Sequence, residues 1–462
     1  MNQSHPTIAA FEAANNMLTQ YLDANRATLQ PLADVEQRIF ELAKEIARTA
    51  LACYVESCGT GDQGAVITDA AGRKRRRHGL RVRPYRSLFG PIAIARMYYY
   101  EPFNGGLAPL DEALWLPERS YSYPLQELVV RQASLGAYDE GRDTLAAMLR
   151  RCVPKSMAEA IVAAQAEYVR DFQTALPGPE AEGTVLVIQA DGKGVRLVVP
   201  KGEKVKGPRI RGKVARRTGT KKMAVVFTIY TLNPEAGCPP VPINRKVYAF
   251  IGPKKEAFAW LVGEATKRGY GTKKTLFLSD GDPGLADLQL ALLPAAEPCL
   301  DWIQATEYLW DAAHLLHPEG SQAAKDWVKH REDLWLAGNV KGFLRGLKQI
   351  LTKRGKRLKK PQREDLAAII GYFERNEARM PYQAFFEAGY PIASGSVEGA
   401  CRHLVADRME GTGMRWKTPG AQAVLHMRSV QLNGEMADFQ AHYAKREQER
   451  LYGVKPRIRA TA

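Results

Sequence analysis

Two aspartates occupy matching positions in the chain, each at the end of a short apolar run and each followed directly by glycine. Asp191 ends the run Thr184–Asp191, and Asp280 ends the run Thr275–Asp280. Apolar runs without polar alternation are typical of strands buried on both faces. Because ligands of α/β sheets gather at the carboxyl ends of strands, we expect the two strands to be neighbours and to bring both carboxylates to one site.

A third acid is needed if these carboxylates hold a pair of divalent ions for phosphoryl transfer. Asp282 competes with Asp280, but it precedes a proline suited to the first position of a helix and is explained as an N-cap. Glu398 is the candidate for the third acid, because it lies in the first turn of a predicted helix and has glycines on both sides. The spacing fits equally well a carboxylate that complements the helix dipole and pairs with Arg402.

Segment 183–301 alternates strand and helix patterns and predicts the sheet that positions the two aspartates. The predicted strands are Thr184–Asp191, Val195–Val199, Met223–Leu232, Thr275–Asp280 and Pro298–Asp301, and the predicted helices are Lys255–Arg268 and Pro283–Leu293. The fold class is therefore α/β, with a mixed five-stranded sheet and flanking helices. Strand-forming residues disappear over 302–390, which predicts an all-helical insertion before the second part of the core, 391–435.

The chain before this core is mainly helical. We expect a helical region over 1–72, a small β element over 73–117 and a DNA-binding region resembling a helix-turn-helix over 118–172. In the β element, Leu80–Arg83 and Ile92–Tyr100 predict paired strands around a Gly-Pro turn. Segment 172–182 is predicted to be a linker, and 436–462 a C-terminal tail.

Basic residues are concentrated in three runs, 73–86, 201–222 and 353–363, in a chain of net charge +16 and pI about 9.5. These runs together hold more than the whole excess of positive charge, so the remainder of the chain is acidic. This segregation favours a phosphate-backbone partner over a merely solvated surface. The residues expected to contact DNA in the first two runs are Arg75, Arg76, Arg77, Arg216 and Arg217.

The six cysteines are dispersed, and only Cys53 and Cys58 are close in sequence. No second Cys or His pair completes a zinc site, so reduced thiols in a cytosolic protein are expected. The N-terminal segment has neither the basic nor the apolar region of a signal peptide. No apolar run approaches the length of a membrane span, so we expect a cytoplasmic protein with no membrane partner.

Three motifs carry a resemblance to a known family. QADGKGV at 189–195, LSDGD at 278–282 and PIASGSVEGACRHLVADRMEGTGMRW at 391–416 resemble the DDE transposases of bacterial insertion sequences, most of all the ISKra-type family. The resemblance covers residues 80 to 430, and segment 105–117 is similar to the part that precedes the family's helical DNA-binding region.

This resemblance implies an RNase H-like core and an enzyme that cleaves and joins DNA with two Mg²⁺ (or Mn²⁺) ions. It assigns the catalytic, metal-binding role to Asp191, Asp280 and Glu398. The implied partner is double-stranded DNA, as transposon ends and target, bound by a homodimer in the bacterial cytoplasm with the nucleoid. The sequence departs from the family at Gln304, where histidine is expected in an Asp-x-x-His motif.

Further DNA contacts are predicted near the three acids. These are Lys193, Arg402, Arg415 and Trp416, with Trp416 stacking on an unpaired base. A core tryptophan under the last helix of the sheet domain is an equal alternative for Trp416. Two other functions remain open for the chain. They are a catalytically silent DNA-binding regulator and an RNase H-like nuclease or resolvase, with an RNA-directed nuclease as a weaker variant.

Overall fold

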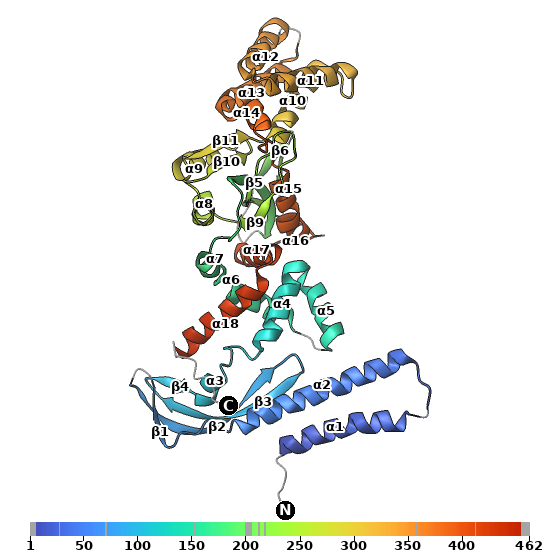
Figure 1. The fold of residues 1–462 in the computed structure, drawn as a ribbon, viewed down its shortest axis with the longest axis vertical. Coiled ribbons are helices and arrows are strands. Elements are labelled where there is room, and N and C mark those ends of the chain that lie inside the picture. Colours follow the sequence, from blue (N-terminus) through green and yellow to red (C-terminus); the bar gives the residue numbers. More distant parts are fainter. Residues whose placement is uncertain are drawn as a thin grey trace, which may run out of the picture. The chain divides into compact units, whose positions relative to one another are not determined.

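The computed structural model describes residues 6–26, 28–69, 72–150, 153–198, 206–210, 213–216, 219–355, 358–411 and 413–453. For 206–210, 213–216, 219–220 and Arg354 it describes the backbone alone. The chain divides into two compact units, one made of Met1–Val162 with Ala437–Ala462 and the other of Ala163–Met436. Figure 1 labels the helices and strands of both units, and each unit is considered by itself below.

The first unit begins with two helices and a four-stranded antiparallel sheet. The helices are α1 (Pro6–Ala24) and α2 (Leu32–Ser57), as their apolar spacing predicts. The strands, in the spatial order β1-β2-β3-β4, are β1 (Val66–Thr68), β2 (Lys74–Arg86), β3 (Pro91–Glu101) and β4 (Gly105–Leu107). Apolar side chains of α2, β3 and the segment after β4 form the core beneath one face of this sheet, namely Val55, Ile92, Ile94, Leu110 and Leu116.

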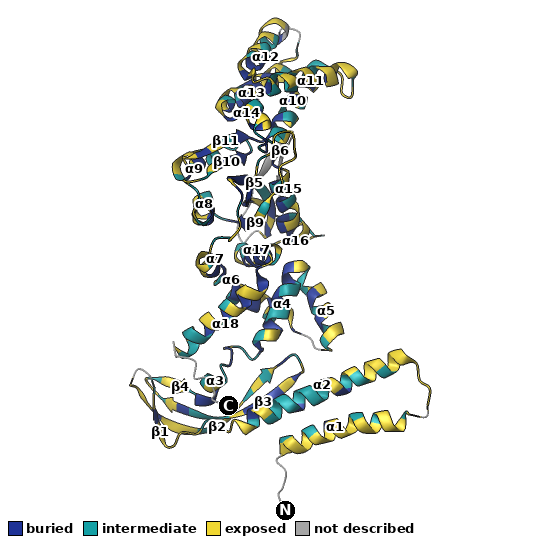
Figure 2. Ribbon diagram, viewed as in Figure 1, coloured by how far each residue is buried: buried dark blue, intermediate teal, exposed yellow. Residues whose placement is uncertain are grey.

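The paired strands predicted around the Gly-Pro turn are confirmed, but the first of them is longer than predicted. The basic run itself forms most of β2, which pairs with β3 from Arg76 to Arg86 around a bulge between Arg77 and Gly79. The arginines are compatible with a strand because most of them lie on exposed positions of β2, which Figure 2 draws largely in yellow.

Three further helices match the predicted helical region, namely α4 (Tyr123–Leu135), α5 (Tyr138–Leu149) and α6 (Lys155–Ala166). Two helices were not predicted, α3 (Pro109–Ala113) and α18 (Met436–Tyr452). The prediction of a C-terminal tail is wrong for 436–452, because α18 has an apolar face that it buries. Its Tyr443 is 4% exposed, and the hydroxyl of that tyrosine donates a hydrogen bond to Gln126 of α4 (3.4 Å).

The second unit contains the predicted mixed five-stranded sheet, in the order β11-β10-β5-β8-β9. The strands are β5 (Val185–Val198), β8 (Gly219–Leu232), β9 (Ile243–Phe250), β10 (Lys274–Ser279) and β11 (Ala296–Leu300). β10 is parallel to β5 and β11, whereas β8 is antiparallel to β5 and β9. A separate two-stranded hairpin, β6 (Lys206–Ile210) and β7 (Lys213–Arg216), lies within the second basic run.

The number of strands is as predicted, but two of the assignments are wrong. The two predicted strands that begin at Thr184 and at Val195 are one continuous strand, β5. The reason is that β8 pairs with β5 along its whole length, including Gly192 and Gly194. Strand β9 is absent from the prediction, because its first half, INRK, is polar and half of its residues lie outside the core. Residue 199, the last of the predicted second strand, lies outside the described residues.

Helices cover both faces of the sheet. One face carries α8 (Lys254–Lys267) and α9 (Pro283–Leu292), which pack on Leu186 and Ile188 of β5.

The prediction that 172–182 is a linker is wrong at its start, because α7 (Val169–Ala175) extends into it and buries Phe172. α17 (Thr418–Leu432) follows the third acid in the chain and is almost wholly buried from Ala421 to Val430.

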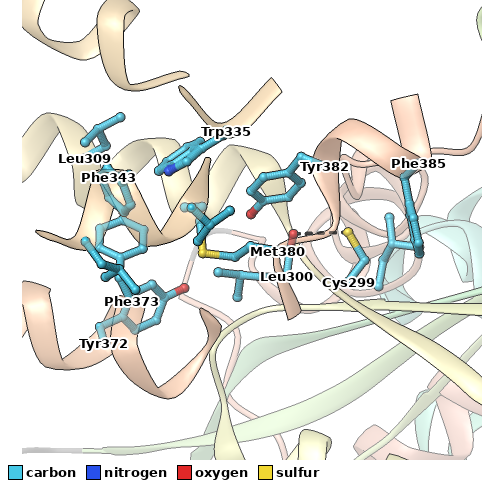
Figure 3. Close-up of a cluster of buried hydrophobic side chains, with 14 of the residues drawn as sticks. Cys299, Leu300, Leu309, Trp335, Phe343, Tyr372, Phe373, Met380, Tyr382 and Phe385 are labelled. Carbon is cyan, nitrogen blue, oxygen red and sulfur yellow. Dashed lines mark hydrogen bonds between the residues drawn. The ribbon is translucent and has the colours of Figure 1, made fainter. Parts of the chain in front are cut away.

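The other face carries the predicted all-helical insertion. It contains α10 (Trp302–Leu316), α11 (Gln322–Leu336), α12 (Val340–Arg354), α13 (Lys360–Arg375), η2 (Glu377–Arg379) and α14 (Tyr382–Glu387). Figure 3 shows aromatic side chains of these helices beside Cys299 and Leu300 of β11. Trp335 is fully buried there, in edge contact with Phe343. The insertion therefore shares one core with the sheet.

Candidate active site

The two aspartates are neighbours where the parallel part of the sheet ends. β10 pairs with β5 in parallel up to Ser279 and Ala190, and Asp280 and Asp191 are the next residues of the two segments. Because neighbouring strands lie about 4.8 Å apart, the two acids are adjacent in space. Alternation along the strands places both side chains on the face that the helical insertion covers. The predicted juxtaposition therefore arises although β5 continues past Asp191.

Asp282 has the capping role predicted for it. Its Oδ1 accepts a hydrogen bond from the backbone N–H of Gly284 (2.7 Å) at the start of α9, and its Oδ2 accepts one from Nζ of Lys254. Asp280 differs, because within the described residues its side chain accepts a single hydrogen bond, from the backbone N–H of Asp282 to Oδ1 (3.0 Å). The carboxylate of Asp280 thus remains available to a ligand.

The turn that contains Asp280 is held by two residues of the insertion that the sequence does not single out. Nη2 of Arg379, 8% exposed, donates hydrogen bonds to Ser279 Oγ (2.7 Å), Ser279 O (3.2 Å) and Asp280 O (3.0 Å). The ring of Tyr372 lies against Gly281, where an added Cβ would be 2.2 Å from it. Both residues are about a hundred positions away along the chain, so no local pattern marks them.

The helix of the third acid is held against β5 by Gln189. Glu398 lies in α15 (Gly395–Ala400), and Oε1 of Gln189 accepts the backbone N–H of Val397 (3.0 Å). Nε2 of the same side chain donates to the hydroxyl of Tyr230 (3.1 Å) and to Ala393 O (3.4 Å). Gln189 is 1% exposed, and its sequence signal is that it is the only polar residue between Val185 and Ala190.

The carboxylate of Asp301, which directly follows β11, also holds the start of α15. Its Oδ1 accepts the backbone N–H of Ser394 (2.9 Å), and its Oδ2 accepts the hydroxyl of the same serine (2.5 Å). It also caps α10 by accepting the backbone N–H of Ile303 (3.2 Å). Asp301 therefore links α10 and α15, and all its acceptor atoms are engaged in that role.

The helix of Glu398 also contacts Asp191 directly. The π-helix η3 (Cys401–Ala406) and α16 (Asp407–Met409) continue α15. Sγ of Cys401 donates to Oδ2 of Asp191 (3.3 Å). Residues three apart on a helix share a face, so Glu398 lies on the same side of this helix as Cys401. Added Cβ atoms at Gly395 and Gly399 would meet nothing within 4 Å, which leaves open space around Glu398.

The electrostatics connect all three acids through Asp191. Burial raises the pKa of Asp280, and the neighbouring carboxylate of Asp191 raises it further. Partial burial raises the pKa of Glu398, and the carboxylates of Asp301 and Asp191 add to this increase. In the part of the chain that the structure describes, none of the three acids forms an ion pair with lysine or arginine. Arg402, the alternative partner of Glu398, is 77% exposed and lies 4.0 Å from Asp407.

The donor set fits a hard divalent cation. Carboxylate oxygens are the ligands that Mg²⁺ and Mn²⁺ prefer, and an uncompensated negative charge is present. A further buried acceptor, Oε1 of Gln304, has no hydrogen-bond partner among the described residues. Across those residues, no group of three His, Cys, Asp or Glu side chains has the spacing of an assembled metal site. Asp191 therefore interacts electrostatically with both other acids, but the three carboxylates are not arranged as a metal site in this structure.

The predicted DNA contacts of the second unit differ in exposure. Lys193 lies 3.7 Å from Glu410, and Arg402 and Arg415 are exposed. Trp416 is half-buried, with its indole N–H donated to Met409 O (3.2 Å) and Arg408 over its ring. These contacts support the packing interpretation of Trp416. The side chain of Arg216 is not described, and Arg217 lies outside the described residues.

The three arginines predicted in the first basic run have different environments. Arg75 is 4% exposed and donates to Asp69 Oδ2 (2.6 Å), Asn104 O (2.7 Å) and Gly105 O (3.1 Å), so it serves the fold. Arg77 pairs with Asp62 (2.8 Å) and keeps a partly exposed side chain. Arg76 is exposed. Of the three, only Arg76 and Arg77 are accessible to a phosphate.

Comparison with known proteins adds no identity: no protein-family model and no curated protein matches the chain. Among the described helices, none has both the length and the apolarity required to cross a membrane.

Proposed function

We propose that the chain is a DNA transposase of the DDE type with an RNase H-like core. The order of the sheet supports this, because three antiparallel strands are extended by two parallel ones, with Asp191 inside the first strand in the chain and Asp280 directly after the fourth. The observation that carries the proposal is the position of Asp191. It is adjacent to Asp280, which directly follows β10, and it accepts a hydrogen bond from Cys401, one turn after Glu398.

In this proposal Asp191, Asp280 and Glu398 would hold two Mg²⁺ or Mn²⁺ ions. Such ions, when bound, polarise the scissile phosphate and favour deprotonation of the attacking water or 3′-hydroxyl. The other residues of the site fix the backbones that carry these acids. Arg379 orients the turn of Asp280, and Gln189 and Asp301 orient the helix of Glu398. Preorganisation of this kind limits the movement needed to bring the third acid to the pair.

The substrates proposed are the terminal inverted repeats of an insertion sequence and a target duplex. The reaction is hydrolysis of a phosphodiester at the element's end, followed by attack of the freed 3′-hydroxyl on a target phosphate. Two ends must be processed together, so a homodimer on DNA in the bacterial cytoplasm is proposed. Exposed Arg402 and Arg415, beside the acids in the sequence, would contact the DNA backbone.

The test uses the full chain with linear DNA that contains the sequences flanking its own coding region. In Mg²⁺, the wild type should nick this DNA at the element's ends and join them to a plasmid. Asp191→Asn, Asp280→Asn and Glu398→Gln should abolish both steps while DNA binding is retained. The matched control is Asp282→Asn, which preserves the N-cap because asparagine caps helices as well as aspartate does.

The outcomes separate the alternatives. Cleavage of branched DNA without joining would favour a nuclease or resolvase. Binding without any Mg²⁺-dependent cleavage would favour a regulator. Loss of cleavage in Asp282→Asn but not in Asp280→Asn would contradict the assignment of the second acid.

A further inference from the structure

Strand β2 contains seven lysine or arginine residues, and the structure separates them into two groups. Three have a carboxylate partner in the chain, in the pairs Arg75–Asp69 (2.6 Å), Arg77–Asp62 (2.8 Å) and Arg83–Asp111 (2.9 Å). The other four are exposed and form no ion pair within the described residues, namely Lys74, Arg76, Arg81 and Arg86. The strand therefore presents positive charge that its own unit does not neutralise.

Aromatic rings of β3 lie next to two of these cations, Arg76 and Arg81. His78 makes edge contacts with Tyr98 (6.1 Å between ring centroids) and Tyr100 (6.0 Å) of β3. The guanidinium of Arg81 lies 3.9 Å from the centroid of the Tyr98 ring, and Arg76 is the register partner of Tyr100. These five residues form one cluster across two strands, which we call the β2–β3 platform.

Tyr99, which lies between the platform residues Tyr98 and Tyr100 in the chain, has a different environment. Tyr99 is fully buried, and its hydroxyl donates to Asp62 (2.8 Å) and accepts the backbone N–H of Gln63 (2.7 Å). Tyr100, in contrast, is 40% exposed and His78 is exposed. Tyr99 therefore serves packing, whereas Tyr100 exposes part of its ring to solvent.

We propose that the β2–β3 platform binds unpaired nucleotides of DNA, with bases stacked on Tyr100 and His78 and phosphates bound by Arg76 and Arg81. Exposed aromatic rings beside cations are the chemistry that single strands require, because an unpaired base has a free face and a nearby phosphate. Bases inside a duplex are already stacked, so such rings add little to duplex binding. The proposal rests on the proposed function only in taking the nucleic acid to be DNA.

The experiment measures binding of the full chain to two fluorescent probes, an oligo-dT of about 20 nucleotides and a duplex of about 20 base pairs, both longer than the stretch one such platform covers. The double variant His78→Ala/Tyr100→Ala should bind oligo-dT roughly tenfold more weakly and the duplex within about twofold of wild type. The matched control is Tyr54→Ala, which removes a tyrosine of α2 that is 62% exposed and lies outside the platform. Unfolding midpoints in urea, measured in parallel, check that the variants are folded.

Four results would contradict the platform proposal. Wild-type affinity for oligo-dT in the double variant would exclude stacking at this site. Equal loss in Tyr54→Ala would show that the effect is not local. A folded wild type that binds the duplex but not oligo-dT would exclude single-strand binding and leave the proposed function standing, whereas failure to bind either probe would contradict both.

Discussion

The two sheets of this protein place their charged residues in opposite ways. The five-stranded sheet is covered on both faces, and two acids at the end of its parallel ladder, Asp191 and Asp280, form no ion pair among the described residues. The four-stranded sheet has its core beneath one face, and four cations spread along β2 form no ion pair among the described residues. A sheet buried on both faces leaves only its end for chemistry, whereas a partly open sheet offers a surface for binding.

From the comparison we expect buried arginines to stabilise the fold. The largest loss of unfolding free energy is expected on substitution of Arg379. Arg379→Met removes hydrogen bonds to Ser279 and Asp280 and leaves their buried acceptors unpaired. We expect a loss of about 3 kcal/mol in the free energy of unfolding, measured in urea, together with loss of cleavage. The matched variant Arg375→Met, at an exposed position of α13, should change stability by less than about 0.5 kcal/mol. Equal effects of the two would contradict the role given to Arg379.

Two neighbouring arginines of β2 have different expected roles. Arg75 stabilises the fold, and Arg76 binds phosphate. Arg75→Gln should cost about 2 kcal/mol of unfolding free energy, because Asp69 and two carbonyls lose a buried partner. Arg76→Gln should leave stability unchanged within about 0.5 kcal/mol. It should instead reduce the magnitude of the slope of log affinity against log salt concentration for oligo-dT by about 0.7. The opposite assignment of the two effects would break the comparison.

Gly281 tests the contact between the insertion and the Asp280 turn. Gly281→Ala brings a methyl group onto the ring of Tyr372, so we expect a loss of roughly 1–3 kcal/mol in unfolding free energy. Gly263→Ala is the matched control, since a Cβ there meets nothing within 4 Å and α8 gains helix propensity of up to about 1 kcal/mol. Destabilisation by both substitutions would show that the loss does not come from Tyr372.

The smallest effect is expected at Cys401. Cys401→Ser keeps a donor for Oδ2 of Asp191, so cleavage should persist and the free energy of unfolding should change by less than about 1 kcal/mol. Cys401→Ala removes the donor and should reduce the rate of cleavage more than the serine variant does. If the alanine and serine variants cleave equally, the thiol has no part in orienting Asp191.

The sequence predicted the parts of the site that depend on local pattern. The strand that contains Asp191, the strand that ends before Asp280, the N-cap at Asp282 and the helix that begins before Glu398 follow from apolar runs, glycine and proline. The continuity of β5 was not predictable, because it depends on pairing with β8, a strand that begins about twenty residues after β5 ends. Glycines that end a strand in isolation are tolerated where a partner continues the ladder.

Most of the residues that hold the acids in place could not be predicted from the sequence. Arg379 and Tyr372 act across a hundred residues, and nothing in α13 or η2 distinguishes them from other helical residues. Gln189 could have been noticed, since a lone amide in a buried strand needs partners for its polar atoms. The fate of Arg75 was likewise undetermined, because its partners Asn104 and Gly105 come from a turn on the far side of β3.

The central claim is that Asp191 holds divalent ions together with Asp280 and Glu398. The most direct test compares the thermal unfolding of wild type and Asp191→Asn, each in EDTA and in Mn²⁺. Raised pKa values of Asp280 and Glu398 mean that, without metal, the folded state gains stability as pH falls through those values and loses it as pH rises. Removing the charge of Asp191 relieves part of this repulsion. At pH 7 in EDTA, Asp191→Asn should therefore unfold at a higher temperature than wild type, and Mn²⁺ should raise the midpoint of wild type only. A variant that unfolds at a lower temperature in EDTA and keeps the full Mn²⁺ response would contradict the account.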